Sequence, residues 1–199
     1  NGFSAYVSNI AAYDSMREDL KLSKKMKMEA SPNDQLNFKT IELQDVSFGY
    51  NSATDLIIKN ITLTIKSGDR VGIIGETGSG KSTLLDLILG LISPSSGKIV
   101  LNGEEDLSKN IRRWHQEIGY VPQQIYLDDK SIVQNIAYCV EDHNINHEKA
   151  IECCKISQAE NFISQLPNGY DTNIGENAAK LSGGQAQRIA IARSLYFNP

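Results

Sequence analysis

The chain has 199 residues, of which 40% are hydrophobic and 22% are charged. This composition is typical of a folded globular protein, and it excludes a chain that stays disordered through high charge and low hydrophobicity. The net charge of -4 at pH 7 argues against a protein whose main task is to wrap nucleic acid, because that binding depends on neutralising phosphates.

The three cysteines lack the paired spacing of a zinc site or a disulfide framework, which indicates a reducing cytosol. Two of them, Cys153 and Cys154, are expected to pack into a helical core as small apolar residues. No stretch reaches the roughly 20 apolar residues that span a bilayer, and the first residues lack the pattern of a signal peptide. The sequence as printed is therefore expected to be soluble.

The first 27 residues carry apolar side chains at alternating three- and four-residue steps, which predicts a helix. Its end is rich in lysine, and a linker is predicted over 28–37 around the break Ser31-Pro32-Asn33-Asp34. A solvated helix end is the simpler interpretation of the lysines. The alternative is a helix that leaves a membrane with its basic residues on the cytoplasmic side.

Short β-rich runs follow at 41–46, 57–65 and 70–74. The alternation of Ile61, Leu63 and Ile65 with polar residues predicts a half-buried antiparallel strand, whereas the continuous apolar run 71–74 predicts a buried parallel strand. A helix over 82–91 and a strand over 98–101 come next. Antiparallel strands should therefore precede a unit of strand, loop, helix and strand.

Beyond Gln123 the pattern is helical, and a helical subdomain is predicted over about 124–183. Helix starts are indicated by Ser131, by Asn146 and by the capping box Ser157-Gln158-Ala159-Glu160. A final amphipathic helix is predicted over 184–197.

A glycine-rich run between a predicted strand and a predicted helix matches the pattern G-x-x-x-x-G-K-[ST] in full. Its residues are Gly75, Glu76, Thr77, Gly78, Ser79, Gly80, Lys81, Ser82 and Thr83. Such a loop presents backbone N–H groups to an anion at the positive end of a helix. In this motif the lysine reaches the terminal phosphates and the serine hydroxyl binds Mg²⁺, so the sequence predicts a nucleoside triphosphate site with Lys81 and Ser82 in these roles.

A second helix start with glycines follows a serine, in the run Leu181-Ser182-Gly183-Gly184-Gln185. This string resembles the signature sequence of ABC ATPases, and the resemblance covers nearly all of 38–199. It implies a P-loop α/β fold with an antiparallel β subdomain and a helical subdomain, and it implies ATP and Mg²⁺ as cofactors. It also implies that two such domains pair head to tail, so that the signature of one covers the γ-phosphate held by the other.

The resemblance assigns further roles residue by residue. Tyr50, in Val46-Ser47-Phe48-Gly49-Tyr50, matches the aromatic residue that stacks on adenine, and Gln123, after Gly119-Tyr120-Val121-Pro122, matches the glutamine that touches Mg²⁺ and the attacking water. Glu176 matches a short exporter element that meets a coupling helix, although Asn177-Ala178-Ala179 departs from the family pattern.

In this family an apolar strand ending in Asp-Glu and a later switch histidine follow the pair seen here as Asn198-Pro199. The printed sequence does not contain them, so the chain is expected to be a fragment with an incomplete sheet that is inactive alone, although the intact protein would be an ATPase.

The resemblance implies an exporter at the cytoplasmic face of the cell's inner membrane, with residues 1–27 as the end of its last membrane helix and a fused membrane domain upstream. Its partners would be that membrane domain and a second, identical nucleotide-binding domain, with no nucleic acid. The alternatives are a soluble ABC-type ATPase of translation or DNA maintenance and a non-hydrolysing interaction module.

Overall fold

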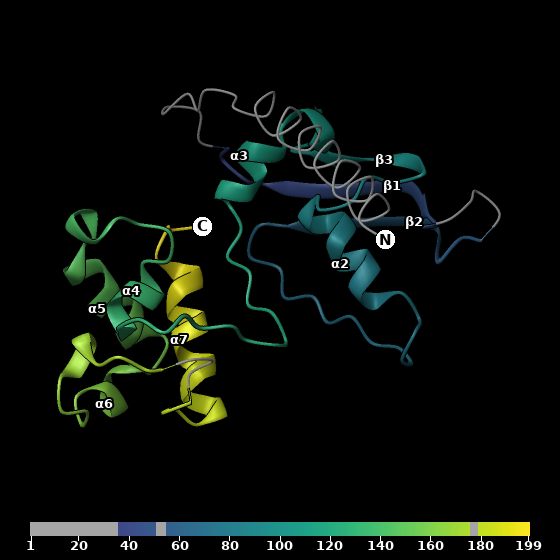
Figure 1. Cartoon of the computed structure of the whole chain (residues 1–199). Helices are drawn as coiled ribbons and strands as arrows, with labels where there is room; N and C mark the ends of the chain where they lie inside the picture. Colours follow the sequence, from purple (N-terminus) through teal and green to yellow (C-terminus); the bar gives the residue numbers. More distant parts are fainter. Residues whose placement is uncertain (1–35, 51–54, 176–178) are drawn as a thin grey trace, which may run out of the picture. The chain divides into compact units, whose positions relative to one another are not determined.

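The computed structural model describes residues 36–50, 55–175 and 179–199. The helix predicted over 1–27, most of the linker predicted over 28–37, and Glu176 lie outside the described residues. Figure 1 gives the order of the elements along the chain.

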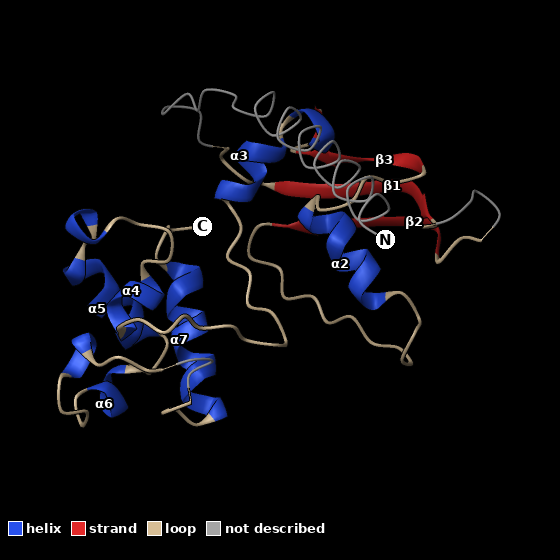
Figure 2. Cartoon of the chain, viewed as in Figure 1, coloured by secondary structure: helices blue, strands red, loops and turns tan. Residues whose placement is uncertain are grey.

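Four strands form a sheet whose pairs are all antiparallel. They are β1 (Thr40–Phe48), β2 (Ile58–Lys66), β3 (Ser96–Leu101) and β4 (Glu105–Asp106), in the spatial order β2-β1-β3-β4 (Figure 2). Ile41 of β1 lies opposite Ile65 on one side and Leu101 on the other. The predicted alternation along β2 is confirmed, because its isoleucines and leucine after Asn60 are half-buried while the polar residues between them are exposed.

Apolar side chains of the sheet share one core with two helices, α2 (Lys81–Leu89) and α3 (Ile111–Gln116). Leu87 of α2 is fully buried in this core, and Trp114 of α3 is 6% exposed. The indole Nε1 of Trp114 donates to the carbonyl of Ile88 at 2.8 Å, so the polar atom of this buried ring is satisfied. The predicted helix over 82–91 and strand over 98–101 are confirmed.

The prediction of a buried strand over 71–74 is wrong. These residues have no strand assignment, Val71 is 51% exposed and Ile74 is 94% exposed. A strand buried on both faces needs ladder partners and cover from other elements. Within the described ranges no segment pairs with 71–74 as a strand, and an apolar composition alone does not supply that partner.

The second half of the described chain is helical, as predicted. Its α-helices are α4 (Ile132–Ile136), α5 (His147–Ile156), α6 (Glu160–Ile163) and α7 (Gly183–Leu195). The predicted starts at Ser131 and Asn146 are confirmed as N-caps that accept from backbone N–H groups. Among the described residues, none of the helices has the length and apolar content needed to cross a membrane.

The capping box predicted at 157–160 is not formed. Helix α6 begins at Glu160 with Ala159 as its N-cap, and no side chain caps it. Ser157 instead ends α5, where its hydroxyl donates to the carbonyl of Cys154 at 3.2 Å. The serine hydroxyl therefore closes the preceding helix, which is a local alternative that the spacing of a capping box does not exclude.

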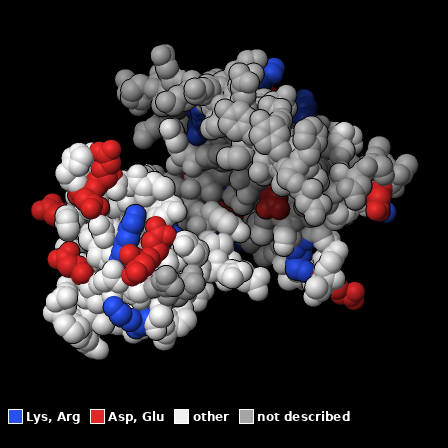
Figure 3. Space-filling model, viewed as in Figure 1, with Lys and Arg blue, Asp and Glu red and all other residues white. Residues whose placement is uncertain are grey.

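An apolar cluster holds the helices together. It includes Ile163, Ile174 and Ile189, each with no exposed surface, and both Cys153 and Cys154, as predicted. Burial raises the pKa of the Cys154 thiol to about 12, so it stays protonated and packs as an apolar group. Figure 3 shows acidic and basic side chains interspersed over the helical part. An exposed ion pair such as that of Lys155 with Glu160, at 3.8 Å, contributes less than about 1 kcal/mol.

This cluster predicts different effects for two isoleucines of the helical part. Ile163→Ala should lower the free energy of unfolding by about 2–5 kcal/mol, because it opens a cavity in the cluster. Ile156, which is 62% exposed, is the matched control, and its replacement by alanine should change the value by less than about 0.5 kcal/mol. Urea unfolding of the two variants measures the difference, and equal losses would contradict this description of the core.

Candidate functional site

The glycine-rich loop leads directly into the start of α2. Gly80 is the N-cap of this helix, with φ of 89° in the left-handed region, and no side chain caps the first turn. Only glycine adopts this conformation without strain, and a Cβ at this position would lie 3.0 Å from side-chain atoms of both Ile57 and Ile58. The first N–H groups of α2 thus keep the positive end of the helix available to an anion.

Lys81 closes over the same loop. Its Nζ donates to the carbonyls of Gly75 at 3.0 Å and of Glu76 at 2.6 Å. These two bonds hold the ammonium group next to the glycine-rich backbone. The loop therefore combines a positive side chain with the positive end of a helix at one place, which is the arrangement that phosphate groups require.

The loop and the start of α2 border a pocket of about 570 Å³. Its lining consists of Ile57, Thr77, Gly78, Gly80, Lys81, Ser82, Thr83 and Gln123. The pocket thus brings Gln123 next to the phosphate loop, although more than 35 positions separate it from Lys81 in the sequence. Ile57 was not identified from the sequence, where it reads only as the beginning of a strand.

The oxygen atoms in this pocket fit a metal ion that arrives with a nucleotide. Mg²⁺ prefers oxygen ligands and usually retains waters and substrate phosphates among them. Ser82 and Gln123, whose side chains carry a hydroxyl and an amide oxygen, both line the pocket. In the described part of the chain no group of three or more His, Cys, Asp or Glu residues could hold a metal ion by itself.

Tyr50 lies at the end of β1, with 58% of its surface exposed. Its ring packs edge-on against Phe48, with 4.9 Å between the ring centroids. The carbonyl of Phe48 accepts a hydrogen bond of 2.8 Å from the N–H of Ile57, which lines the pocket. The exposed ring of Tyr50 is therefore linked through Phe48 to Ile57, a residue that lines the pocket.

The second predicted anion site is the start of α7. Ser182 is its N-cap: the hydroxyl accepts from the N–H of Gln185 at 3.3 Å, and the amide oxygen of Gln185 accepts from the N–H of Ser182 at 2.8 Å. The helix start was predicted from the sequence, whereas this reciprocal capping box, which the spacing S-x-x-Q signals, was not. The serine proton remains available to a further acceptor, and Gly183 and Gly184 are exposed.

The two helix starts border different pockets. A second pocket of about 610 Å³ lies between the segment 121–125 on one side and, on the other, Leu181 and the first half of α7, which contributes Gly183, Ala186 and Gln187. Ser182 is absent from the lining of the phosphate-loop pocket, whereas Gln123 contributes to both pockets. Gln123 therefore lies between the phosphate-loop pocket and the pocket beside α7.

A phosphate loop that opens a helix, with a lysine over the loop and a serine after it, defines a nucleotide-binding protein of the P-loop class. Comparisons with known proteins narrow this class. The family model described as "ABC transporter" matches residues 58–199. The chain therefore belongs to the ABC transporter family, whose members are ATP-hydrolysing transporters, and family membership implies that it binds ATP.

Three curated relatives carry names from transport. The chain is 41% identical over 159 residues to ABC transporter B family member 13 of Arabidopsis thaliana, covering 80% of this chain and 13% of that protein. It is 43% identical over 160 residues to the alpha-hemolysin translocation ATP-binding protein HlyB of Escherichia coli O157:H7, covering 80% and 22%. It is 39% identical over 158 residues to the ATP-dependent lipid A-core flippase of Haemophilus influenzae (strain 86-028NP), covering 79% and 27%.

A solved structure of a bacterial Atm1-family ABC exporter with ATP bound matches 94% of this chain and 34% of that chain, with a TM-score of 0.74 and 32% identity. This match confirms the predicted ABC ATPase fold. The present chain spans only 13–27% of the three curated relatives named above.

The geometry of the phosphate loop predicts that Gly80→Ala lowers the free energy of unfolding by about 1–2 kcal/mol, because alanine is strained at positive φ. The contacts with Ile57 and Ile58 would add to this loss. Gly183→Ala is the matched control, since Gly183 also begins a helix but a Cβ there meets no atom within 4 Å and its φ is not positive. Thermal or urea unfolding measures both, and a Gly80→Ala variant as stable as Gly183→Ala would contradict the left-handed conformation.

Proposed function

We propose that this chain is the ATP-binding domain of an ABC exporter, which couples MgATP binding and hydrolysis to movement of a substrate across a membrane. The observation that carries this proposal is the presence, in one chain, of two helix starts suited to bind phosphate: the loop closed by Lys81 and the signature that begins at Ser182. The family match over 58–199 supports it, and so do relatives named for translocation and lipid A-core flipping.

In the proposed site, the loop 75–80 and the start of α2 bind the phosphates through backbone N–H groups, and Lys81 neutralises their charge. Lys81 would exchange its hydrogen bonds to the carbonyls of Gly75 and Glu76 for bonds to phosphate oxygens. Mg²⁺ would supply charge neutralisation at the terminal phosphates. Ser82 and Gln123 would hold it, and Gln123 would also orient the attacking water.

Tyr50 would bind the adenine ring by stacking. Such a contact contributes about 1–3 kcal/mol and reads no pattern of hydrogen-bond donors and acceptors. The exposure of Tyr50, 58% of its surface, supports this role. Other purine nucleotides should therefore bind nearly as well as ATP.

The helix start at Ser182 would act on a nucleotide held by a second copy of the domain. Ser182 is not part of the lining of the phosphate-loop pocket of its own chain, and the serine proton is not needed for its own capping bonds. In a head-to-tail pair, Ser182 of the partner subunit would donate to the γ-phosphate bound by Lys81. Closure of the pair on ATP and its reopening after hydrolysis would then drive the transport cycle.

The membrane partner is part of the same proposal. The matched structure is that of an exporter, so we infer a membrane domain that is attached to this one and contacts it through coupling helices. The chain would then work at the cytoplasmic face of the membrane. Selection of the cargo would take place in the membrane domain.

Lys81→Ala tests the nucleotide site. Loss of a charge-assisted bond to phosphate should weaken MgATP binding by about 10- to 100-fold. Lys98→Ala, which removes an exposed lysine from β3, should leave the affinity unchanged. Isothermal titration calorimetry of both variants measures the effect, and tight MgATP binding by Lys81→Ala would show that the loop is not the phosphate site.

Ser182→Ala tests the shared interface, with Ser131→Ala as the matched control because both serines form a capping box at a helix start. Each variant should lose about 1 kcal/mol of stability. Only Ser182→Ala should also lose ATP-dependent pairing of the domains in size-exclusion chromatography with light scattering, while its affinity for a single nucleotide is retained. Unchanged pairing of Ser182→Ala would contradict the role across the interface.

A further inference from the structure

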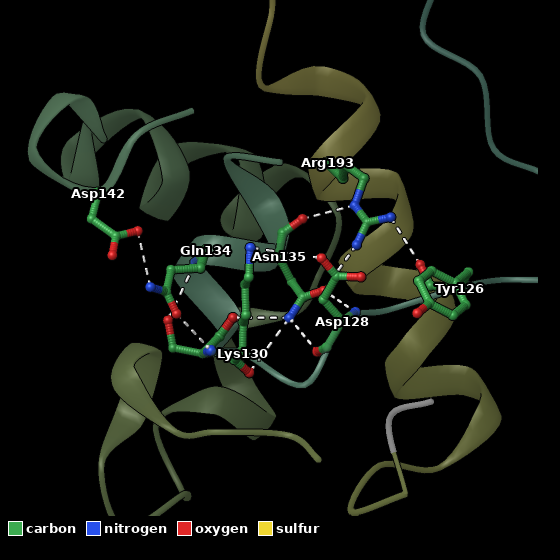
Figure 4. Close-up of polar contacts among 8 residues, drawn as sticks. Tyr126, Asp128, Lys130, Gln134, Asn135, Asp142 and Arg193 are labelled. Carbon is green, nitrogen blue, oxygen red and sulfur yellow. Dashed lines mark hydrogen bonds and ion pairs between the residues drawn. The ribbon is translucent and has the colours of Figure 1, made fainter. Parts of the chain in front are cut away.

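Arg193, on the last turns of α7, binds two separate backbone segments (Figure 4). Its Nε donates to the carbonyl of Asn135 at 2.7 Å, and its Nη2 donates to the side-chain Oδ1 of Asn135 at 3.0 Å. Its Nη1 donates to the carbonyl of Tyr126 at 2.9 Å. The guanidinium also lies 4.7 Å from the centre of the Tyr138 ring. All three hydrogen bonds reach residues that follow Gln123 in the sequence.

Asn135 extends this contact into the loop that begins at Asp128. The Asn135 side chain is fully buried; its Oδ1 accepts from the N–H of Asp128 at 2.8 Å, and its Nδ2 donates to the carbonyls of Asp128 and Ser131, both at 3.0 Å. A buried amide with its bonds satisfied specifies one local conformation. Through Asn135, Arg193 is therefore connected to the loop between Asp128 and Ser131, whose conformation these hydrogen bonds fix.

The other end of the same segment contacts α7 at the neighbouring residue. A Cβ on Gly119 would lie 2.8 Å from the carbonyl oxygen of Ser194 and 2.9 Å from Cγ of Pro199. Gly119 does not have a positive φ, so its backbone conformation does not require glycine. A residue without a side chain is needed there because the two backbones approach closely. The segment that contains Gln123 is thus held against α7 both before and after Gln123.

Between these two contacts, residues 121–125 face the first half of α7 across the pocket of about 610 Å³. Gln123 is exposed in the middle of this stretch and also lines the phosphate-loop pocket. A side chain on a segment fixed at only one end would sample many positions. Fixation at both ends ties the position of Gln123 to that of α7.

We propose that Arg193 is a positioning residue, which holds the segment 119–126 against α7 so that Gln123 reaches the nucleotide in the correct place. This inference rests on the proposed function, because it assumes that Gln123 acts on Mg²⁺ and the attacking water. Since α7 begins at Ser182, the same contacts make Gln123 and the signature move together.

The chemistry of the guanidinium suits this role. Arginine presents several N–H donors in a rigid plane, whereas lysine presents a compact charge that cannot form this fork. Burial lowers the pKa of Arg193, while Tyr138 and Asp128 oppose that change. The group stays charged at neutral pH, because the ordinary arginine pKa lies far above it.

Arg193→Lys in the full-length protein tests the proposal. It should lower kcat for ATP hydrolysis about 10-fold or more, because a displacement near 1 Å at a reacting group can cost about 100-fold. The affinity for MgATP should change less than twofold, since Lys81 and the phosphate loop are untouched. Arg188→Lys is the matched control on the same helix. Within the described ranges Arg188 makes one hydrogen bond, to the carbonyl of Gln158 at 3.1 Å, and its replacement should leave kcat unchanged.

A double-mutant cycle with Gln123→Ala separates positioning from a general loss of structure. If Arg193 acts through Gln123, Arg193→Lys should lower kcat by less than twofold once Gln123 is alanine. If the losses of kcat from Arg193→Lys and Gln123→Ala multiply in the double variant, the two residues act independently and the proposal is overturned. A loss of kcat from Arg188→Lys equal to that from Arg193→Lys would also overturn it. Should Arg193→Lys fail to fold, Gly119→Ala releases the other end of the segment. Its effect on kcat is then measured with and without Gln123→Ala, and the same two results decide the proposal.

This test is distinct from that of the proposed function. Retained MgATP binding by Lys81→Ala would reject the nucleotide site itself. Loss of binding in Lys81→Ala together with independent effects of Arg193→Lys and Gln123→Ala would leave the nucleotide site in place and reject only the positioning role.

Discussion

The proposed function depends on the electrostatics of helix starts. The first turn of a helix has N–H groups without intrahelical partners and about half a positive charge, and both features attract anions. At α2 the cap is a glycine with no side chain, and Lys81 adds a full charge beside it. At α7 the cap is Ser182, whose own bonds leave a proton to donate. The rest of the fold holds these two starts and Gln123 in place.

Much of this arrangement could be predicted from the sequence, because the relevant signals are local. The spacing of glycines before Lys81 indicates a loop and helix start, and the alternation along β2 indicates its exposed and buried faces. Prediction failed for two different reasons. The run 71–74 has the composition of a buried strand but is exposed, because composition alone supplies no ladder partner. Ser157 closes the end of α5 instead of capping the start of α6, because two local hydrogen-bond patterns compete for the same hydroxyl.

The contacts of Arg193 illustrate the same limit. In the sequence, Arg193 is one of several polar residues on an amphipathic helix, and its spacing distinguishes it little from Arg188. Only the fold shows that Arg193 contacts carbonyls 58 and 67 positions away, while Arg188 reaches a single carbonyl 30 positions away. Gly119 likewise has no local signal, because its requirement comes from the backbone of Ser194. Long-range packing therefore contributes the link between Gln123 and the signature helix that motif spacing leaves undetermined.

In the proposed dimer, both helix starts bind the phosphates of the same nucleotide, each from a different copy of the domain. A structure of the full-length protein with a non-hydrolysable MgATP analogue bound tests this arrangement. We expect γ-phosphate oxygens within hydrogen-bond distance of Lys81 Nζ and of the hydroxyl of Ser182 of the partner subunit. A nucleotide bound by Lys81 with the signature of every copy directed away from it would refute the shared site.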